Sequence, residues 1–302
     1  MKRFLLFVLL SFCLVNQAFT QQMAIIDSEL YELMNSNSSD KINVNIILKE
    51  QFDANQMNVR RSFSSREDRR TYMVNEMKAQ TENLQADVLK TLKANERSVQ
   101  VTDIKCHWLT NMINCNATPD AILKIAEHPD VKMIAWNKKR KVIHDESEKK
   151  TVETRATAAE IAENIAQVNA PQVWDLGFTG KGVVVAVIDS GANIDHVDLK
   201  DHLWDDGSGH CGFNTIDNSY NVYDGFYHGT HCAGTVCGDG TSGLATGVAP
   251  DAQLMVLKAL DDEGKSAIDD VVEAMETGLF SYVAHPDLFM RSYDKFDEAC
   301  QK

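Results

Sequence analysis

One apolar run constrains the fold of this 302-residue chain more than any other stretch. Residues 183–188 contain no polar side chain, and the run ends in Asp189, which Ser190 and Gly191 follow. A strand that is apolar on both faces is typical of the interior of a parallel sheet, because helices then cover both faces. An aspartate at the carboxyl end of such a strand points into the crevice where open α/β folds place their ligands. Asp189 is therefore either a functional carboxylate or the cap of the following turn.

Composition and charge exclude two classes of protein. Hydrophobic residues make up 44% of the chain and charged residues 25%, which is typical of globular rather than disordered proteins. The formal net charge of -14 argues against nucleic acid as a partner, because a basic surface is needed to displace counterions from phosphates. We therefore expect an α/β protein, long enough for two folded domains.

The first 20 residues have the pattern of a secretory signal peptide. Two basic residues precede a short apolar stretch from Phe4 to Val15, which is too short to cross a bilayer. We expect residues 1–20 to be removed and the mature protein to be secreted, without membrane attachment after cleavage. Disulfides can form in such a compartment, and Cys106 and Cys115 could pair across a predicted hairpin.

Residues 41–141 predict a small α+β module. Their patterns follow the order strand, helix, strand, strand, helix, strand, which is the ferredoxin-like arrangement. Alternating β-branched residues predict a strand over residues 42–49, and Thr118 with Pro119 opens the second helix as N-cap and first helical residue. The sequence of this module shows no catalytic pattern. Residues 142–158, which follow it, are polar and charged and have the composition of a linker.

The second part of the chain, residues 159–277, contains a candidate partner for Asp189. A loop rich in glycine and aspartate leads to the sequence HGTHCAGTV, residues 228–236. Its small residues would let a helix pack closely on the strand beneath it. His228 stands at the start of that helix, where an imidazole can shuttle protons while a carboxylate fixes its tautomer. The alternative is a metal site with His228 and His231 as ligands, but the further ligands that zinc requires are not arranged around them.

The motifs VIDSG and HGTHCAGTV together resemble the aspartate and histidine motifs of the subtilisin-like serine proteases, peptidase family S8, and the histidine motif is most similar to the proteinase K branch. The resemblance implies an incomplete parallel-sheet domain that hydrolyses protein or peptide substrates. It implies that Asp189 is the orienting acid and His228 the general base. It also implies that the first module is an inhibitory propeptide, which would be the chain's own intramolecular inhibitor. Asp198 matches a position where some family members bind calcium, and no other cofactor is required.

The serine that would complete the family's triad is not found. In the subtilisin order of Asp, His and Ser, the serine follows the histidine by a longer segment than this chain contains. The sequence GTSGLA echoes the nucleophile motif, but its Ser242 lies in a glycine-rich loop and is expected to be far from His228. We therefore expect the chain to be truncated before its nucleophile and inactive as given. The strand that would bind the substrate is not recognised either, so the sequence does not predict peptide specificity.

The tail, residues 278–302, departs from the subtilase pattern. These last 25 or so residues of the chain resemble the segment around the His-Pro-Asp motif of PHP-type metal phosphoesterases. That resemblance would place His285 and Asp287 near a metal. The paired histidines that such an enzyme needs earlier in its chain are absent. This favours a joined reading frame as the origin of the tail.

The alternative to an enzyme is a non-catalytic protein, in which the first module inhibits proteases or assists their folding.

Overall fold

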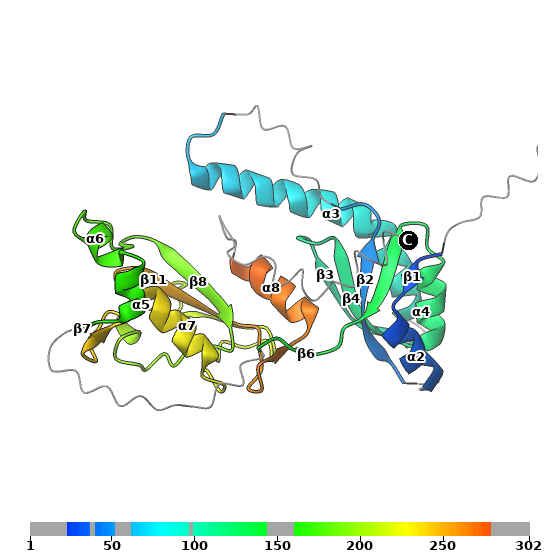
Figure 1. Cartoon of the computed structure of the whole chain (residues 1–302). Helices are drawn as coiled ribbons and strands as arrows, with labels where there is room; N and C mark the ends of the chain where they lie inside the picture. The colour runs from blue at the N-terminus through cyan, green and yellow to red at the C-terminus, as the bar shows by residue number, and fades with distance from the viewer. Residues whose placement is uncertain (1–22, 37–39, 52–61, 97–98, 144–159, 279–302) are drawn as a thin grey trace, which may run out of the picture. The chain divides into compact units, whose positions relative to one another are not determined.

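The protein is described here by a computed structural model, in which the chain forms two compact units (Figure 1). The first unit takes in Met1–Ser62 and Asn75–Trp136, and the second takes in Phe63–Val74 and Asn137–Lys302. Within them the structure describes residues 23–36, 40–51, 62–96, 99–143 and 160–278. The predicted signal peptide, most of the predicted linker, and His285 and Asp287 of the tail lie outside these residues. No helix of the described ranges is both long and apolar enough to cross a membrane.

The first unit contains a five-stranded sheet, two helices and the larger part of a third helix, whose residues 66–74 are assigned to the second unit. Its sheet has the order β1-β5-β2-β4-β3, with β2 antiparallel to β4 and β5, and β1 parallel to β5. From β2 to β5 the elements follow the predicted order of strand, helix, strand, strand, helix, strand. The bounds are β1 (Ile25–Ile26), α2 (Ser28–Ser36), β2 (Ile42–Leu48), α3 (Arg66–Glu96), β3 (Val101–His107), β4 (Met112–Ala117), α4 (Pro119–Ala126) and β5 (Val131–Trp136).

One apolar core holds the first unit together, and it begins before the predicted module does. Because α2 precedes residue 41 and buries Leu30 in this core, the folded unit starts earlier than the sequence pattern indicated. The helix α4 starts as predicted, since the Thr118 side chain accepts a hydrogen bond from the Ala121 N–H and proline opens the helix. Other almost fully buried members of the core are Ile46, Leu92, Ile113, Ile122 and Ile134.

Cys106 and Cys115, which could have paired across the predicted hairpin, do not form a disulfide in the structure. Cys106 is exposed on β3 and lies opposite Ile113 of β4. Cys115 is buried in the core, in the part of β4 where the pairing with β3 shifts register. The two thiols therefore point to different environments, and the spacing of cysteines in the sequence could not reveal this.

The second unit is built on a three-stranded parallel sheet with the order β8-β11-β9. Two short ladders accompany it, a parallel one between β7 and β10 and an antiparallel one between β6 and β12. The predicted α/β class with a parallel sheet is confirmed. The strands are β6 (Arg140–Lys141), β7 (Glu160–Ile161), β8 (Val184–Asp189), β9 (Gly212–Asn214), β10 (Leu244–Ala245), β11 (Gln253–Lys258) and β12 (Lys265–Ser266). The helices are α5 (Glu163–Gln167), α6 (Ala170–Trp174), the 3-10 turn η1 (Lys200–His202), α7 (His228–Cys237) and α8 (Ile268–Gly278).

Alternate residues of β8 pack against two different cores. Val185 and Val187 contact the cluster that includes Ala233 and Cys237 of α7, whereas Ala186 and Ile188 join the cluster of α8. Both faces are thus partly covered, as the apolar run predicted. The strand is nevertheless at the edge of the sheet, because β11 is its one partner among the described residues. Its first residue, Val184, is consequently 42% exposed rather than buried.

Candidate active site

Asp189 ends β8 at the carboxyl edge of the parallel sheet. Its carbonyl oxygen accepts hydrogen bonds from the backbone N–H groups of Ala259 at 2.9 Å and Leu260 at 3.1 Å, which follow β11. Its carboxylate accepts the Ser190 N–H at 2.7 Å. The residue is 8% exposed, so backbone groups rather than water fix the end of the strand and its side chain.

The helix α7 begins at His228 and brings its imidazole to that carboxylate. The Nδ1 atom lies 2.9 Å from each of the two carboxylate oxygens of Asp189. A carboxylate in this position holds the N–H on Nδ1 and leaves Nε2 as the atom that accepts a proton. The His228 side chain is 31% exposed and that of Asp189 11%. The base is therefore open to solvent while its partner is shielded.

A close contact between two glycines permits this approach. Gly229, in the first turn of α7, packs so closely on Gly191 that a Cβ atom at Gly229 would lie 2.0 Å from the Gly191 carbonyl oxygen. Gly191 has a φ of +105°, a conformation that favours glycine. Among the other small residues of α7, Ala233 is buried. Gly234 does not share the tight contact, because a Cβ there would meet only the Thr246 hydroxyl at 3.6 Å.

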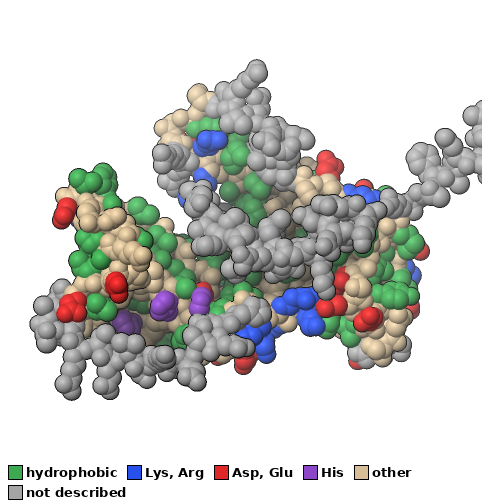
Figure 2. All heavy atoms as spheres, in the orientation of Figure 1, with side chains coloured by type: hydrophobic (Ala, Val, Ile, Leu, Met, Phe, Trp, Pro, Cys, Tyr) green, Lys and Arg blue, Asp and Glu red, His purple; other side chains and the backbone are tan. Residues whose placement is uncertain are grey.

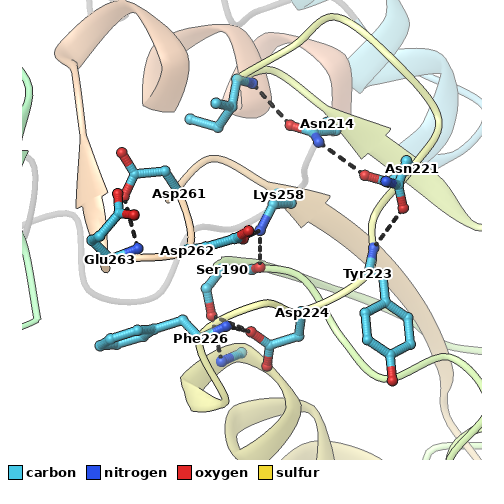
Figure 3. Close-up of polar contacts among 12 residues, drawn as sticks. Ser190, Asn214, Asn221, Tyr223, Asp224, Phe226, Lys258, Asp261, Asp262 and Glu263 are labelled. Carbon is cyan, nitrogen blue, oxygen red and sulfur yellow. Dashed lines mark hydrogen bonds and ion pairs between the residues drawn. The ribbon is translucent and has the colours of Figure 1, made fainter.

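A buried hydrogen-bond network joins the end of β8 to the start of α7. In Figure 3, Ser190 lies between Asp224 on one side and Lys258 on the other. The Ser190 hydroxyl donates to the Asp224 carboxylate at 2.9 Å and accepts the Gly229 N–H at 3.0 Å. The same carboxylate accepts at 2.8 to 2.9 Å from three more backbone N–H groups, those of Phe226, Tyr227 and Thr230. Asp224 thereby caps the helix that carries the imidazole.

Lys258 supplies a buried positive charge beside this network. Its Nζ donates to the Ser190 carbonyl oxygen at 2.6 Å and to the Asp262 carboxylate at 2.9 Å. Lys258 is 7% exposed, and these acceptors replace the water that a buried ammonium group loses. In the sheet register it lies directly opposite Asp189. The end of β8, which carries Asp189, is thus held by the hydrogen bonds of the Ser190 hydroxyl and of the Lys258 ammonium group.

The environment of Asp224 predicts a sensitivity to acid. Burial raises the pKa of this carboxyl, but hydrogen bonds from Thr230, Phe226 and Tyr227 outweigh burial and bring the pKa below its ordinary value of 3.8. A carboxyl whose pKa is lower in the folded than in the unfolded state stabilises the fold above the unfolded value. That stabilisation is lost as the pH falls through the folded value.

We expect the Asp224→Asn variant to be less stable than the wild type by about 1–3 kcal/mol near neutral pH, because the amide cannot accept all the hydrogen bonds of the carboxylate. The difference should shrink as the pH falls below 3.8, where the wild type loses the same contribution. Urea unfolding at a series of pH values measures both effects. The exposed Asp201→Asn variant is the control, and equal pH profiles for Asp224→Asn and the wild type would refute the role of Asp224.

Tyr227, which precedes His228, has a backbone conformation that tyrosine rarely adopts. Its φ is 98° and its ψ is -31°, in the region that favours glycine. Its ring rests against that of Phe226, with the ring centroids 4.7 Å apart. The hydrogen bonds from both N–H groups to Asp224 hold this turn, and such local strain is typical of functional sites.

Asp198 and Ser242 bind each other instead of joining the Asp189–His228 pair. Ser242 donates its N–H and its hydroxyl to the Asp198 carboxylate, each at 2.6 Å. No hydrogen bond joins Ser242 to His228 in the described part of the chain, as the sequence predicted. Both carboxylate oxygens of Asp198 accept a hydrogen bond from Ser242, and calcium needs about six to eight oxygen ligands, of which Asp198 could supply at most two. The calcium role of Asp198 stays a prediction.

Cys232 is a neighbour of the pair that the sequence did not reveal. Its Sγ lies 3.6 Å from the Nδ1 atom of His228. Burial raises the pKa of this thiol to about 12, and the charge of Asp189 contributes in the same direction, so the thiol is neutral at physiological pH. The signal was its position four residues after His228, which places both side chains on one face of a helix. Sequence patterns also did not indicate Ser190, Asp224 or Lys258. Hydrogen bonds between distant segments leave no regular spacing of residues in the sequence.

A cavity of about 780 Å³ lies in the second unit beside α7. Figure 2 shows histidine side chains at the surface of this region. Neither Asp189 nor His228 lines the cavity, but Asp224 and Tyr227 from the turn before His228 do. Its polar lining includes His196, Asp198, Tyr223, Asp224, His231 and Ser242.

Comparisons with known proteins match part of the second unit to a known family. Residues 180–279 match the model of the subtilase family, peptidase S8. Bacillopeptidase F of Bacillus subtilis is 30% identical over 224 residues, which are 69% of this chain and 15% of that protein. The minor extracellular protease Vpr of the same organism is 32% identical over 164 residues, 51% of this chain and 20% of the relative. Subtilisin E, also from Bacillus subtilis, is 36% identical over 120 residues, 39% of this chain and 29% of the relative.

A solved structure is also similar in sequence, that of a cold adapted subtilisin-like serine proteinase. It is 27% identical, the match covers 33% of this chain and 32% of the other, and the TM-score is 0.28. The chain thus spans less than a third of the length of each of these relatives. The family match ends at residue 279, and the likeness of the tail to metal phosphoesterases stays a prediction. Residues 180–279, which hold Asp189 and His228, therefore belong to the subtilase family of serine peptidases, peptidase family S8.

Proposed function

We propose that this chain is the precursor of a secreted serine endopeptidase, in which Asp189 and His228 are two members of an Asp-His-Ser triad. The contact of the His228 Nδ1 atom with both Asp189 oxygens at 2.9 Å carries the proposal. In the triad reaction a serine attacks the peptide carbonyl, and the histidine takes the serine proton at Nε2 and passes it to the leaving amine. The aspartate stabilises the imidazolium that forms in between.

The chain as given should not hydrolyse peptides by itself. In the described part of the chain no serine hydroxyl is hydrogen-bonded to His228, and the family's serine motif is not found in the sequence. We therefore expect a fluorophosphonate probe, which labels activated serines, to leave the full chain unlabelled. Labelling of a serine in this chain would overturn the proposed inactivity and support an active enzyme.

Supplying the missing serine tests the catalytic assignment. A chimera would join this chain up to Gly278 to the part of Subtilisin E that follows its matched segment, where the subtilisin order places the serine. The folded chimera is expected to hydrolyse a chromogenic peptide and to react with the fluorophosphonate probe. A chimera that unfolds cooperatively, but shows neither property, would contradict the assignment.

We further propose that the first unit and the segment after it inhibit the peptidase. Support comes from β6, whose Arg140 and Lys141 pair antiparallel with Ser266 and Lys265 of β12. The next residue continues the pairing, since the Val142 N–H donates to the Gly264 carbonyl oxygen at 3.0 Å. An extended segment that adds to a sheet edge is a common mode of peptide binding. Residues 140–143 would then occupy the substrate edge that the sequence did not reveal.

Two fragments of the chain test this inhibitory role. We expect residues 21–143 to inhibit Subtilisin E, and residues 21–136, which lack β6, to bind at least about tenfold more weakly, because each lost backbone hydrogen bond is worth about 1 kcal/mol. Inhibition constants from peptide hydrolysis measure the difference. Absence of inhibition by both fragments would refute the proposal. Inhibition together with an inert folded chimera would favour the alternative, a non-catalytic protease inhibitor.

Secretion is part of the same proposal. It is supported by the basic and apolar pattern of residues 1–20. The relatives include the minor extracellular protease Vpr but also the major intracellular serine protease of Bacillus subtilis. We propose protein or peptide substrates because the family consists of peptidases. The chain covers only part of the length of its relatives, so the peptide sequences that the enzyme would cleave are left to experiment.

A further inference from the structure

The turn between β11 and β12 carries three acidic residues in succession, Asp261, Asp262 and Glu263 (Figure 3). Asp262 is paired with the buried Lys258. The segment that contains β6 is basic, since residues 138–141 are all lysine or arginine. Both segments belong to the second unit. Charges of opposite sign therefore meet at the edge where β6 pairs with β12.

The Asp261 carboxylate uses one oxygen to hold the turn and the other to bind a lysine. Its Oδ1 atom accepts the backbone N–H groups of Glu263 at 3.1 Å and Lys265 at 2.9 Å, a local contact of the kind that closes turns. Its Oδ2 atom lies 3.3 Å from the Nζ atom of Lys139. Burial raises the pKa of Asp261, but these hydrogen bonds together outweigh burial and keep the pKa below its ordinary value of 3.8. The carboxylate is thus ionised at neutral pH.

Ile143 fixes the register of the basic segment along this edge. Its side chain is 9% exposed and belongs to an apolar cluster of the second unit. The backbone N–H groups of Val142 and Ile143 both donate to the Gly264 carbonyl oxygen, at 3.0 Å and 3.4 Å. An aliphatic residue held in this cluster places the residue four positions earlier beside Asp261. In this chain that residue is Lys139.

A second position in the same segment has the opposite electrostatic environment. Lys141 lies directly opposite Lys265 in the antiparallel pairing of β6 with β12. Side chains at opposite positions of an antiparallel pair lie on the same face, and like charges there repel each other. The edge thus favours a cation at one position and disfavours a cation two residues later. A uniform attraction between an acidic turn and a basic peptide would not distinguish the two positions.

We propose that Asp261 determines specificity at the substrate edge by selecting a lysine or arginine four positions before an aliphatic residue, and that Lys265 disfavours a basic residue two positions before it. Backbone pairing would supply affinity, and these side chains would supply the choice among sequences. The proposal rests on the proposed function, because it takes residues 139–143 as occupying the place of a substrate. The Lys139 side chain is 48% exposed and that of Asp261 15%, so we expect each position to contribute about two- to fivefold.

Hydrogen exchange in the full chain tests both positions without hydrolysis. The protection factor of the Val142 amide reports how often residues 140–143 leave the edge, and it corrects for the intrinsic exchange rate of each sequence. We expect Lys139→Gln to lower this factor about threefold, and Lys141→Gln, the same substitution two residues away, to raise it by a similar amount. Asp261→Asn should also lower it about threefold. Asparagine keeps the Oδ1 acceptor of the turn but presents an amide nitrogen to the lysine in place of Oδ2.

Glu263→Gln is the matched control for Asp261→Asn. It removes an exposed charge from the same turn and leaves the contact between Asp261 and Lys139 in place. We expect it to change the protection factor by less than about 1.5-fold, because charges that are exposed to solvent and not in contact are screened. Near-ultraviolet circular dichroism establishes that each variant is folded, and the contact is tested from both of its sides, so one folded variant suffices.

The serine-supplied chimera tests the same preference in substrates. Three chromogenic peptides would differ only in the residue four positions before a shared isoleucine, which is lysine, glutamine or glutamate. We expect kcat/KM to fall about threefold from lysine to glutamine and about tenfold from lysine to glutamate, because the last change replaces attraction by repulsion. In a chimera that carries Asp261→Asn, the three peptides should differ by less than about twofold.

Unchanged protection in the Lys139→Gln and Asp261→Asn variants would overturn the inference. Shifts of the same sign in Lys139→Gln and Lys141→Gln would overturn it as well, since they would indicate a general attraction between charges. An active chimera that cleaves the three peptides equally well would contradict this inference alone. The expected protection factors together with a folded but inert chimera would contradict the proposed function alone.

Discussion

Replacing His228 by alanine in the serine-supplied chimera is expected to lower turnover about a million-fold, the loss that removal of the triad histidine causes in subtilisin. Without the imidazole no group takes the proton of the serine. Asp189→Asn should lower turnover about ten-thousand-fold, because an amide favours the wrong tautomer of the imidazole that it contacts. Peptide hydrolysis at saturating substrate measures both losses, provided that cooperative unfolding of each variant is retained.

His231→Ala is the matched control for His228→Ala. Both histidines lie in the same helix and motif, but His231 is exposed and lies outside the Asp189–His228 contact. We expect its removal to change turnover by less than about tenfold, since it contacts no group of the reaction as proposed. Similar losses in the two variants would mean that the motif supports the fold and not the chemistry, and the assignment of His228 as the base would fail.

Gly229→Ala is expected to destabilise the second unit by about 3 kcal/mol, within the range of overpacked cores. The expected sign is opposite to the usual one, because alanine stabilises the interior of a helix by about 1 kcal/mol relative to glycine. Here the added methyl group would lie 2.0 Å from the Gly191 carbonyl oxygen, a backbone atom that cannot rotate away. The helix must then move off β8, and His228 with it. Urea unfolding of the full chain measures the loss.

Gly234→Ala provides the comparison within the same helix. A methyl group at this position would meet the Thr246 hydroxyl at 3.6 Å, an ordinary contact, so helix propensity should dominate and stabilise the unit by up to about 1 kcal/mol. The two substitutions are chemically identical and lie five residues apart. Shifts of the same sign in both variants would show that the packing of Gly229 on Gly191 does not control stability.

The elements of the first unit were largely predictable because their signals are local. Alternation over residues 42–49 and the Thr118–Pro119 start of α4 depend on neighbours in the chain, and both appear in the structure. The contribution of α2 was not predicted, since a short helix is stable only when a core covers its apolar residues. The environments of Cys106 and Cys115 depend on strand register, which no count of cysteines contains.

The sequence by itself determined where the chemistry could lie. The apolar strand that ends in Asp189 and the helix of small residues that starts with His228 can each be recognised from a short, continuous stretch of sequence. The tertiary structure alone decided that these segments meet at 2.9 Å, that Ser190, Asp224 and Lys258 hold them, and that Cys232 joins them. It also decided that β8 lies at a sheet edge among the described residues. The physical reason is that hydrophobic periodicity records which side of an element is buried, whereas packing between distant segments determines which polar groups share that burial.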